Sequence, residues 1–149
     1  MSEEPQEIGE RAFNFAVRVV NLCQSLEGKK GVSRTLVNQL LRSGTSVGAN
    51  LEGSKGGQSW ADYLSKVSIA LKEARETRYW LRLHVATDII PENQLAPLLD
   101  ESNQIVAILT TIIKKLKSDS ISHFSFLTSH FPNDRYQPKT TGQHPLEHR

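Results

Sequence analysis

Two adjoining segments decide the fold, and they read RSGTSVGANLEG (Arg42–Gly53) and SWADYLSKVSIALKEARETRYWL (Ser59–Leu81). The first is rich in small residues, including Gly44 and Gly48. An interior glycine destabilises a helix by about 1 kcal/mol relative to alanine, so a helix with several glycines needs a compensating contact. Close approach of another backbone, or of a partner, supplies one. We therefore predict that the first segment is a helix that packs tightly against a neighbour.

The second segment carries the signals of a long helix. Ser59 and Asp62 have the Ser-x-x-acid spacing of a capping box, which predicts a helix start at Trp60. No proline or glycine follows until after Asp88, so nothing in the sequence interrupts the helix before that point. The apolar positions recur at steps of three and four, which is typical of a buried helical stripe. They are Leu64, Val67, Leu71, Ala74, Leu81 and Val85.

Similar apolar stripes predict three more helices. These cover residues 8–26, 33–53 and 95–117, and Ser33 is the predicted N-cap of the middle one. Pro97 either kinks the last helix near its start or marks its first turn. Because the connections between the four predicted helices are short, the sequence favours an all-α fold, an antiparallel up-down four-helix bundle.

The chain is predicted to divide into a bundle over residues 1–117 and a flexible, mostly disordered tail over residues 118–149. The tail holds four of the five histidines together with Ser, Thr, Pro, Gly and Asn, and it shows no helical periodicity. Four large apolar residues are the exception, namely Phe124, Phe126, Leu127 and Phe131. They would either dock a short segment on the bundle or a partner, or simply make the tail sticky.

Composition limits the classes of function. At 149 residues the chain is most simply one domain, and a net charge of +2 is too small to require an anionic partner. The single cysteine, Cys23, excludes an intramolecular disulfide and a cysteine-rich zinc site. Together with the lack of a visible secretion signal, this predicts a cytoplasmic location. The most apolar stretch, residues 105–113, is short and contains threonines, so we expect a core helix and no membrane span.

No pattern in the sequence points to a cofactor, a metal or a catalytic centre. Cys23 lies in the apolar stripe of the first predicted helix, where we expect a small core residue. The tail histidines are spaced too irregularly for a rigid metal site, and the Ser-Gly and Gly-Gly stretches lack the lysine of a phosphate-binding loop. We therefore expect a non-enzymatic protein.

The segments Arg42–Gly53 and Ser59–Leu81 resemble the central helical hairpin of the four-helix-bundle family of bacterial 23S rRNA intervening-sequence proteins. The likeness lies in a small-residue segment ending in Ala-Asn, a glycine linker, a serine, an aromatic residue and an Ala-Leu-Lys-Glu-Ala helix. It covers residues 11–117. The resemblance implies an antiparallel bundle that often assembles into homo-oligomeric rings, commonly pentamers.

The resemblance also implies partners. One relative, the accessory variability determinant of diversity-generating retroelements, is a basic ring thought to bind nucleic acid and a reverse transcriptase. RNA or DNA, and a protein such as a reverse transcriptase, are therefore the expected partners, and no catalytic residues are implied. Many relatives carry an acid three positions after the asparagine matching Asn50, whereas here Gly53 stands there and the acid is Glu52. One step turns a side chain by about 100° around a helix, which displaces or removes that contact.

A basic strip is the best candidate for nucleic-acid binding. It consists of Lys72, Arg75, Arg78 and Arg82, spaced along one face of the third predicted helix, with Tyr79 and Trp80 beside it. Guanidinium groups bind phosphates bidentately and stack on bases, and aromatic rings offer further stacking. The alternative is an ordinary solvated face with intrahelical ion pairs, because Glu73 and Glu76 alternate with the arginines.

Three large apolar residues, Ile69, Trp80 and Leu83, fall outside the buried stripe of the same helix. They predict a subunit interface, because a monomer rarely leaves such an area in water. The alternative is a wide apolar face in a bulky bundle.

Two alternative functions stay open. One is a structural adaptor that binds a protein and has no affinity for nucleic acid. The other is a ribonuclease, since Arg78 and His84 have the loose Arg-x4-6-His spacing of the HEPN ribonucleases, in which an imidazole acts as general acid or base. The sequence favours the other interpretation of His84, an interface or half-buried histidine, because the Arg-x4-6-His spacing occurs readily by chance.

Overall fold

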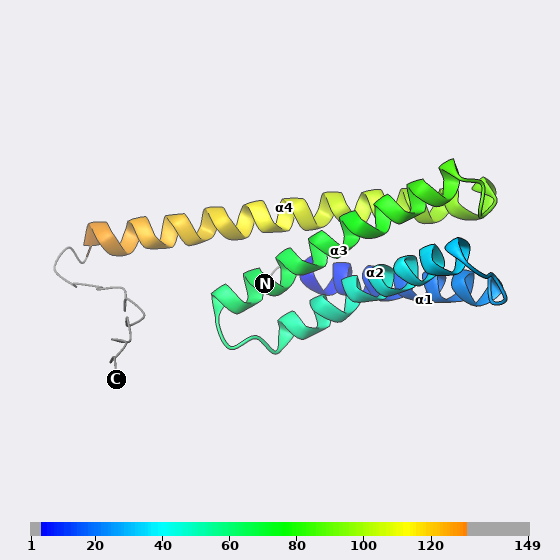
Figure 1. Cartoon of the computed structure of the whole chain (residues 1–149). Coiled ribbons are helices and arrows are strands. Elements are labelled where there is room, and N and C mark those ends of the chain that lie inside the picture. The colour runs from blue at the N-terminus through cyan, green and yellow to red at the C-terminus, as the bar shows by residue number, and fades with distance from the viewer. Residues whose placement is uncertain (1–3, 131–149) are drawn as a thin grey trace, which may run out of the picture. The chain divides into compact units, whose positions relative to one another are not determined.

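The structure is a computed structural model that describes residues 4–130, with side chains described over residues 8–122. It contains four helices, α1 (Glu4–Ser25), α2 (Val32–Lys55), α3 (Trp60–Ala86) and α4 (Glu92–His130), and residues 4–130 include no strand (Figure 1). The predicted all-α class is confirmed. The chain divides into two units between Leu116 and Lys117, and the helical bundle belongs to the first.

Helix α2 holds the first unit together, because it packs against both α1 and α3. In Figure 1 the α1–α2 and α3–α4 turns lie at one end of this unit and the α2–α3 turn lies at the other. Helix α1 is joined to α4 by a two-point contact in which Arg11 donates from Nε and Nη2 to the two carboxylate oxygens of Glu101, at 3.0 and 3.1 Å. These contacts agree with the predicted antiparallel arrangement.

The core is built from the apolar stripes that the sequence shows. Every helix contributes fully buried side chains, among them Phe15 and Val19, Leu40 and Val47, Val67 and Leu81, and Leu95, Ile105 and Leu109. Each such side chain stabilises the fold by about 1.5–3 kcal/mol when it leaves water. The stripe predicted for residues 8–26 is confirmed. Its first four apolar residues are buried, namely Ile8, Ala12, Phe15 and Val19, and Leu22 and Leu26 pack against the core.

The small residues of α2 allow α1 to approach closely. A Cβ atom added to Gly44 would lie 2.9 Å from Cγ1 of Val19, and one added to Gly48 would lie 3.5 Å from the carbonyl atoms of Ala12. Gly44 therefore has no room for a side chain, whereas a Cβ at Gly48 would make only an ordinary van der Waals contact with the backbone of α1. The predicted close contact is confirmed, and the neighbour is α1.

The helix ends agree with the sequence signals at α3 and differ at α2. Ser59 caps α3, because its side-chain oxygen accepts from the backbone N–H of Asp62 at 3.1 Å. The predicted cap of α2 at Ser33 is wrong. That helix begins at Val32, and its N-cap is Gly31, two residues before Ser33. The φ of 64° at Gly31 suits glycine, which offers no side-chain cap.

Helix α4 is longer than the sequence periodicity predicts. It continues to His130, so the prediction of a mostly disordered stretch from residue 118 is wrong as far as residue 130. Periodicity reports a packed face and not the helix itself, and no glycine or proline occurs between Pro97 and Pro132. Pro97 lies inside α4 beyond its first turn, so the first-turn interpretation is wrong.

The predicted tail extends past the residues that the structure describes. Residues 131–149, with Phe131 among them, lie outside the described part, as do the side chains of Phe124, Phe126 and Leu127. Across the described helices, none is long and apolar enough to cross a membrane.

The close contact at Gly44 makes a direct prediction about stability. The variant Gly44→Ala should lower the free energy of unfolding by about 1–2 kcal/mol, because overpacking against the stiff Val19 side chain outweighs the gain in helix propensity. The matched control is Gly53→Ala in the same helix, where an added Cβ meets no atom within 4 Å. It should raise the stability by about 0.5–1 kcal/mol.

Urea denaturation followed by circular dichroism measures both changes. If Gly44→Ala were as stable as Gly53→Ala, the tight α1–α2 contact at that position would be contradicted.

Candidate nucleic-acid interface

The structure places the predicted basic strip at the surface of α3. Lys72, Arg75 and Arg82 are exposed and Arg78 is half-buried. The buried residues of this helix, such as Leu71, Ala74 and Leu81, turn toward the core. From Lys72 to Arg82 the helix rises about 15 Å at 1.5 Å per residue, so the cations form a line and not a cluster.

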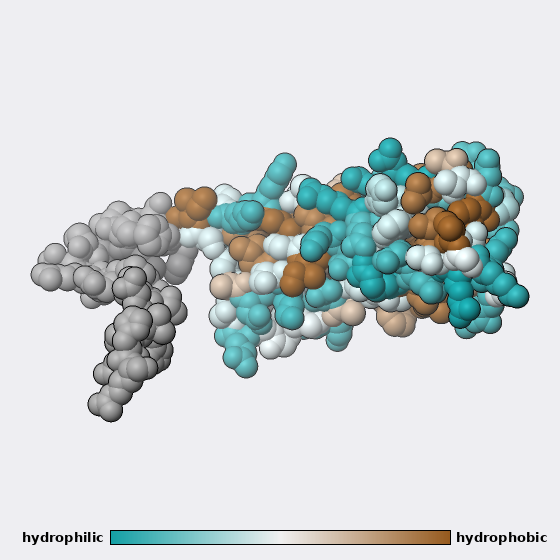
Figure 2. All heavy atoms as spheres, viewed as in Figure 1, coloured by the Kyte–Doolittle hydropathy of each residue, from teal (hydrophilic) through white to brown (hydrophobic). Residues whose placement is uncertain are grey.

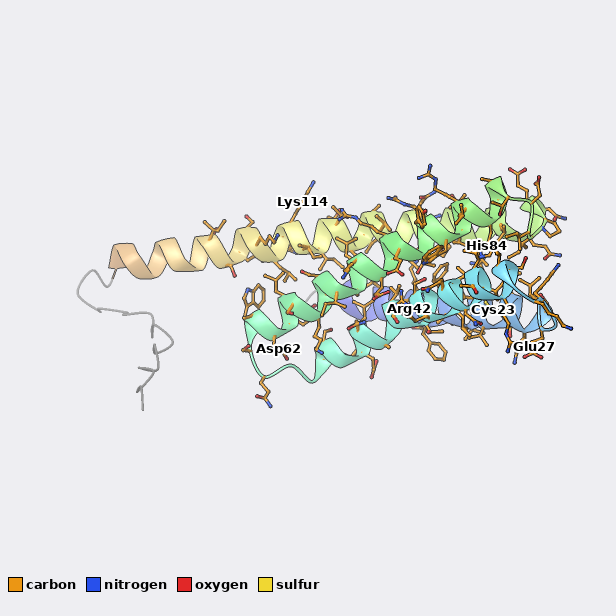
Figure 3. The ribbon with its side chains drawn as sticks, in the orientation of Figure 1. Cys23, Glu27, Arg42, Asp62, His84 and Lys114 are labelled. Atoms are coloured by element: carbon orange, nitrogen blue, oxygen red, sulfur yellow. The ribbon has the colours of Figure 1, made fainter. Side chains whose placement is uncertain are left out.

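The two glutamates between these cations form ion pairs with an arginine of another helix. Arg42 of α2 reaches across to α3, where its Nη1 lies 3.3 Å from Oε2 of Glu73 and its Nη2 pairs with Oε1 of Glu76 (Figure 3). Both carboxylates are therefore paired with α2, and Lys72 of the strip also lowers the pKa of Glu76 from within α3. Within residues 8–122, Arg75, Arg78 and Arg82 form no ion pair.

Glu76 is held in its charged form. Burial would raise the pKa of this carboxyl, but hydrogen bonds from Arg42 and from the Trp80 Nε1 at 3.2 Å outweigh burial, so the pKa lies below its ordinary value. The carboxylate is thus ionised at neutral pH and stays bound to Arg42. Arg42 supplies one positive charge for the two carboxylates, so it offsets part of their charge. In the described part of the chain, Arg75, Arg78 and Arg82 are left without an ion pair.

An exposed aromatic ring belongs to the strip. Tyr79 stands four residues after Arg75 and seven after Lys72, which puts all three on one face of the helix. Its side chain is 53% exposed. The ring packs edge-on against Trp80, with centroids 5.0 Å apart and planes inclined by 74°. One face of Tyr79 can therefore be supported by Trp80 while the ring remains accessible for stacking.

The three predicted interface residues differ in exposure. Ile69 is 38% exposed, whereas Trp80 and Leu83 are half-buried and Trp80 packs against the core. Packing within the bundle thus accounts for part of the burial of the Trp80 side chain. Figure 2 shows hydrophobic side chains reaching the surface in separate patches among hydrophilic ones on the face that it displays.

The sequence interpretation missed a second apolar patch, on α1. Phe13 is 65% exposed and Val17 is 43% exposed. They stand four residues apart, on one face of the helix and outside its buried stripe. That spacing was visible in the sequence, and the structure leaves both side chains exposed.

His84 is placed where it cannot reach a substrate. It is fully buried, and neither ring nitrogen has a hydrogen-bond partner of normal geometry in the described part of the chain (Figure 3). Burial lowers its pKa below the ordinary value of 6.5, while the nearby Leu36 carbonyl opposes part of this effect. The Arg78–His84 pair therefore offers no imidazole at the surface for ribonuclease chemistry.

The structure also shows the surroundings of Cys23 and of the possible metal ligands. Cys23 is buried, and burial raises the pKa of its thiol to about 11, so it is protonated at neutral pH. Among the described side chains, no group of three or more His, Cys, Asp and Glu residues is arranged to hold a metal ion.

Comparisons with known proteins agree on one family. The family model described as 23S rRNA-intervening sequence protein matches residues 4–111. A crystal structure of a protein of unknown function, from the S23 ribosomal protein family of Bacteroides thetaiotaomicron, is 42% identical with a TM-score of 0.68. The match covers 74% of this chain and 98% of that one. No match was found among curated proteins.

Buried His84 predicts a pH-dependent stability. Because its folded pKa lies below 6.5, the unfolded chain takes up a proton that the folded chain does not. Its contribution is complete above about pH 6.5 and is lost as the pH falls, by up to about 1.4 kcal/mol per pH unit. His84→Gln should remove this slope.

Urea denaturation of both proteins at a series of pH values tests the prediction, since all other titrating groups are common to the two. Parallel stability curves would contradict it.

Proposed function

We propose, from the premise that this chain belongs to the 23S rRNA-intervening sequence protein family, that it is a non-enzymatic homo-oligomer that binds RNA or DNA through α3. The observation that carries the proposal is the bridge from Arg42 to Glu73 and Glu76. It pairs the two carboxylates of α3 with a cation of α2, so within residues 8–122 the arginines of the basic strip have no ion-pair partner and are available to phosphates.

The strip has the chemistry of a backbone contact. Three arginines can each donate two parallel hydrogen bonds to a phosphate, and Lys72 adds a fourth positive charge. Tyr79 stands among them with an exposed ring on which an unpaired base can stack. A contact of this kind tracks a strand and does not read base edges, so we expect little dependence on sequence.

Oligomerisation would make such a strip effective. A net charge of +2 is low for a nucleic-acid-binding chain, so one copy should bind weakly. Several copies on one strand would bind far more tightly, because each contact after the first becomes intramolecular. The assembly and the strip are thus two parts of one proposal.

Two separate apolar patches support the assembly. One is Phe13 with Val17 on α1, and the other is the exposed Ile69 on α3, with Trp80 and Leu83 three to four turns further along that helix. A head-to-tail ring needs two different surfaces on each subunit, whereas a twofold dimer needs only one. Patches on two different helices favour the ring.

Neutralising the strip should abolish nucleic-acid binding without unfolding the bundle. We expect the triple variant Arg75→Gln, Arg78→Gln, Arg82→Gln to lose affinity for a labelled single strand. The slope of log K against log salt should become shallower by about 2, because three phosphate contacts are removed. Fluorescence anisotropy over a salt series measures both quantities.

The matched control removes three cations from a different part of the bundle, by the changes Lys29→Gln, Lys30→Gln and Arg34→Gln. It should keep the wild-type slope. Equal losses in both variants would show that only net charge matters and would contradict the assignment to α3.

The apolar patches make a prediction about mass. Phe13→Glu and Ile69→Glu should each reduce the particle to a 16.7 kDa monomer, because a buried unpaired carboxylate is strongly unfavourable at an interface. Val32→Glu is the control, since Val32 is 74% exposed but stands at the start of α2 away from both patches. Sedimentation velocity measures the masses, and wild-type mass in both patch variants would contradict these surfaces.

A protein-binding adaptor is the second candidate, and the exposed Phe13 favours it. Under that function the wild-type protein would show no affinity for either RNA or DNA at low salt, while the patch variants would lose a protein partner.

A further inference from the structure

A cavity of about 480 Å³ opens beside the α1–α2 turn. It is formed by the end of α1, the turn itself and the first turns of α2. Its volume lies within the range of small-molecule sites in proteins. Neither the basic strip of α3 nor the exposed patch of Phe13 and Val17 contributes to its wall.

The floor of the cavity is apolar. Val20, Cys23 and Leu26 of α1 and its turn face Val37 and Leu41 of α2 across it. Cys23 is only 7% exposed and its thiol donates to the Val37 carbonyl oxygen at 3.8 Å, which joins the two helices under the floor. Figure 3 places Cys23 near the end of α1 and Glu27 in the turn that follows. This surface suits an aromatic or aliphatic group.

The rim is basic. Lys29, Lys30 and Arg34 line it together with a single carboxylate, Glu27, so three positive charges stand against one negative charge. In the part of the chain with described side chains, none of these four forms an ion pair. The positive charge of the rim is therefore available to a ligand.

The backbone adds to the positive potential of the rim. Helix α2 begins at this point with Gly31 as its N-cap, no side-chain cap and no acidic residue in its first turn. The positive end of the helix dipole therefore lies at Gly31, between Lys30 and Arg34 in the sequence.

We propose that this cavity binds a small organic anion, with an apolar body on the Val20–Val37–Leu41 floor and a carboxylate or phosphate group at Lys29, Lys30 and Arg34. Such a ligand would bridge α1 and α2 at their turn. The site is independent of the nucleic-acid contact proposed for α3, because the two share no residue.

Isothermal titration calorimetry on the full chain tests the proposal with four probes. 1-Naphthoate and 1-naphthyl phosphate carry both features, 1-naphthylmethanol lacks the charge, and inorganic phosphate lacks the apolar body. Each naphthyl anion should bind at least about tenfold more tightly than the alcohol, which corresponds to one charge-assisted hydrogen bond. Inorganic phosphate should show no measurable binding. The tighter of the two anions identifies the headgroup.

Two triple variants locate the site. Changing Lys29, Lys30 and Arg34 to glutamine should weaken 1-naphthoate at least about tenfold, whereas changing Arg75, Arg78 and Arg82 to glutamine should leave its affinity unchanged. All of these side chains are exposed or half-buried, so both variants keep the core. Equal binding of the alcohol, equal loss in both variants, or no binding of either anion would overturn the proposal.

Cys23 reports occupancy directly, because it is the only cysteine of the chain. Alkylation by N-ethylmaleimide, followed by intact mass spectrometry, should slow about tenfold at a 1-naphthoate concentration ten times its Kd. Binding that leaves the alkylation rate unchanged would place the ligand elsewhere and overturn the assignment.

Discussion

The close approach of α1 and α2 across Gly44 is the constraint on which the rest of the structure depends. With no side chain at that position, Val19 of α1 fills the space. One face of α2 is thereby committed to α1, and its other face is left for α3. Because α2 packs against both α1 and α3, its polar side chains can reach α3, and Arg42 does so.

Arg42 links the packing of the bundle to its proposed function. It stands two residues before Gly44 and bonds two glutamates of α3, so the same helix that forms the tight contact also pairs with the acidic residues beside the basic strip. In free energy an exposed pair of this kind contributes only about 0–1 kcal/mol. Its larger effect is electrostatic, because within residues 8–122 the three arginines beside the exposed tyrosine are left without an ion pair.

Much of the fold was predictable, because stripes and caps are local signals. The core positions of α1 and the Ser59 cap follow from spacing alone. The extension of α4 to His130 was missed because the sequence shows no apolar period beyond residue 117. The Arg42 bridge was missed because its partners are 31 and 34 residues away, and their approach depends on the register of two helices. The basic strip was visible in the sequence, but the pairing of its neighbouring glutamates with another helix was not.

The most direct test of the account is light scattering of the wild-type protein after size exclusion at low salt, with absorbance recorded at 260 and 280 nm across the peak. A homo-oligomeric nucleic-acid-binding module predicts a particle of several 16.7 kDa subunits that carries excess absorbance at 260 nm. A 16.7 kDa monomer free of nucleic acid would contradict both the assembly and the role of α3.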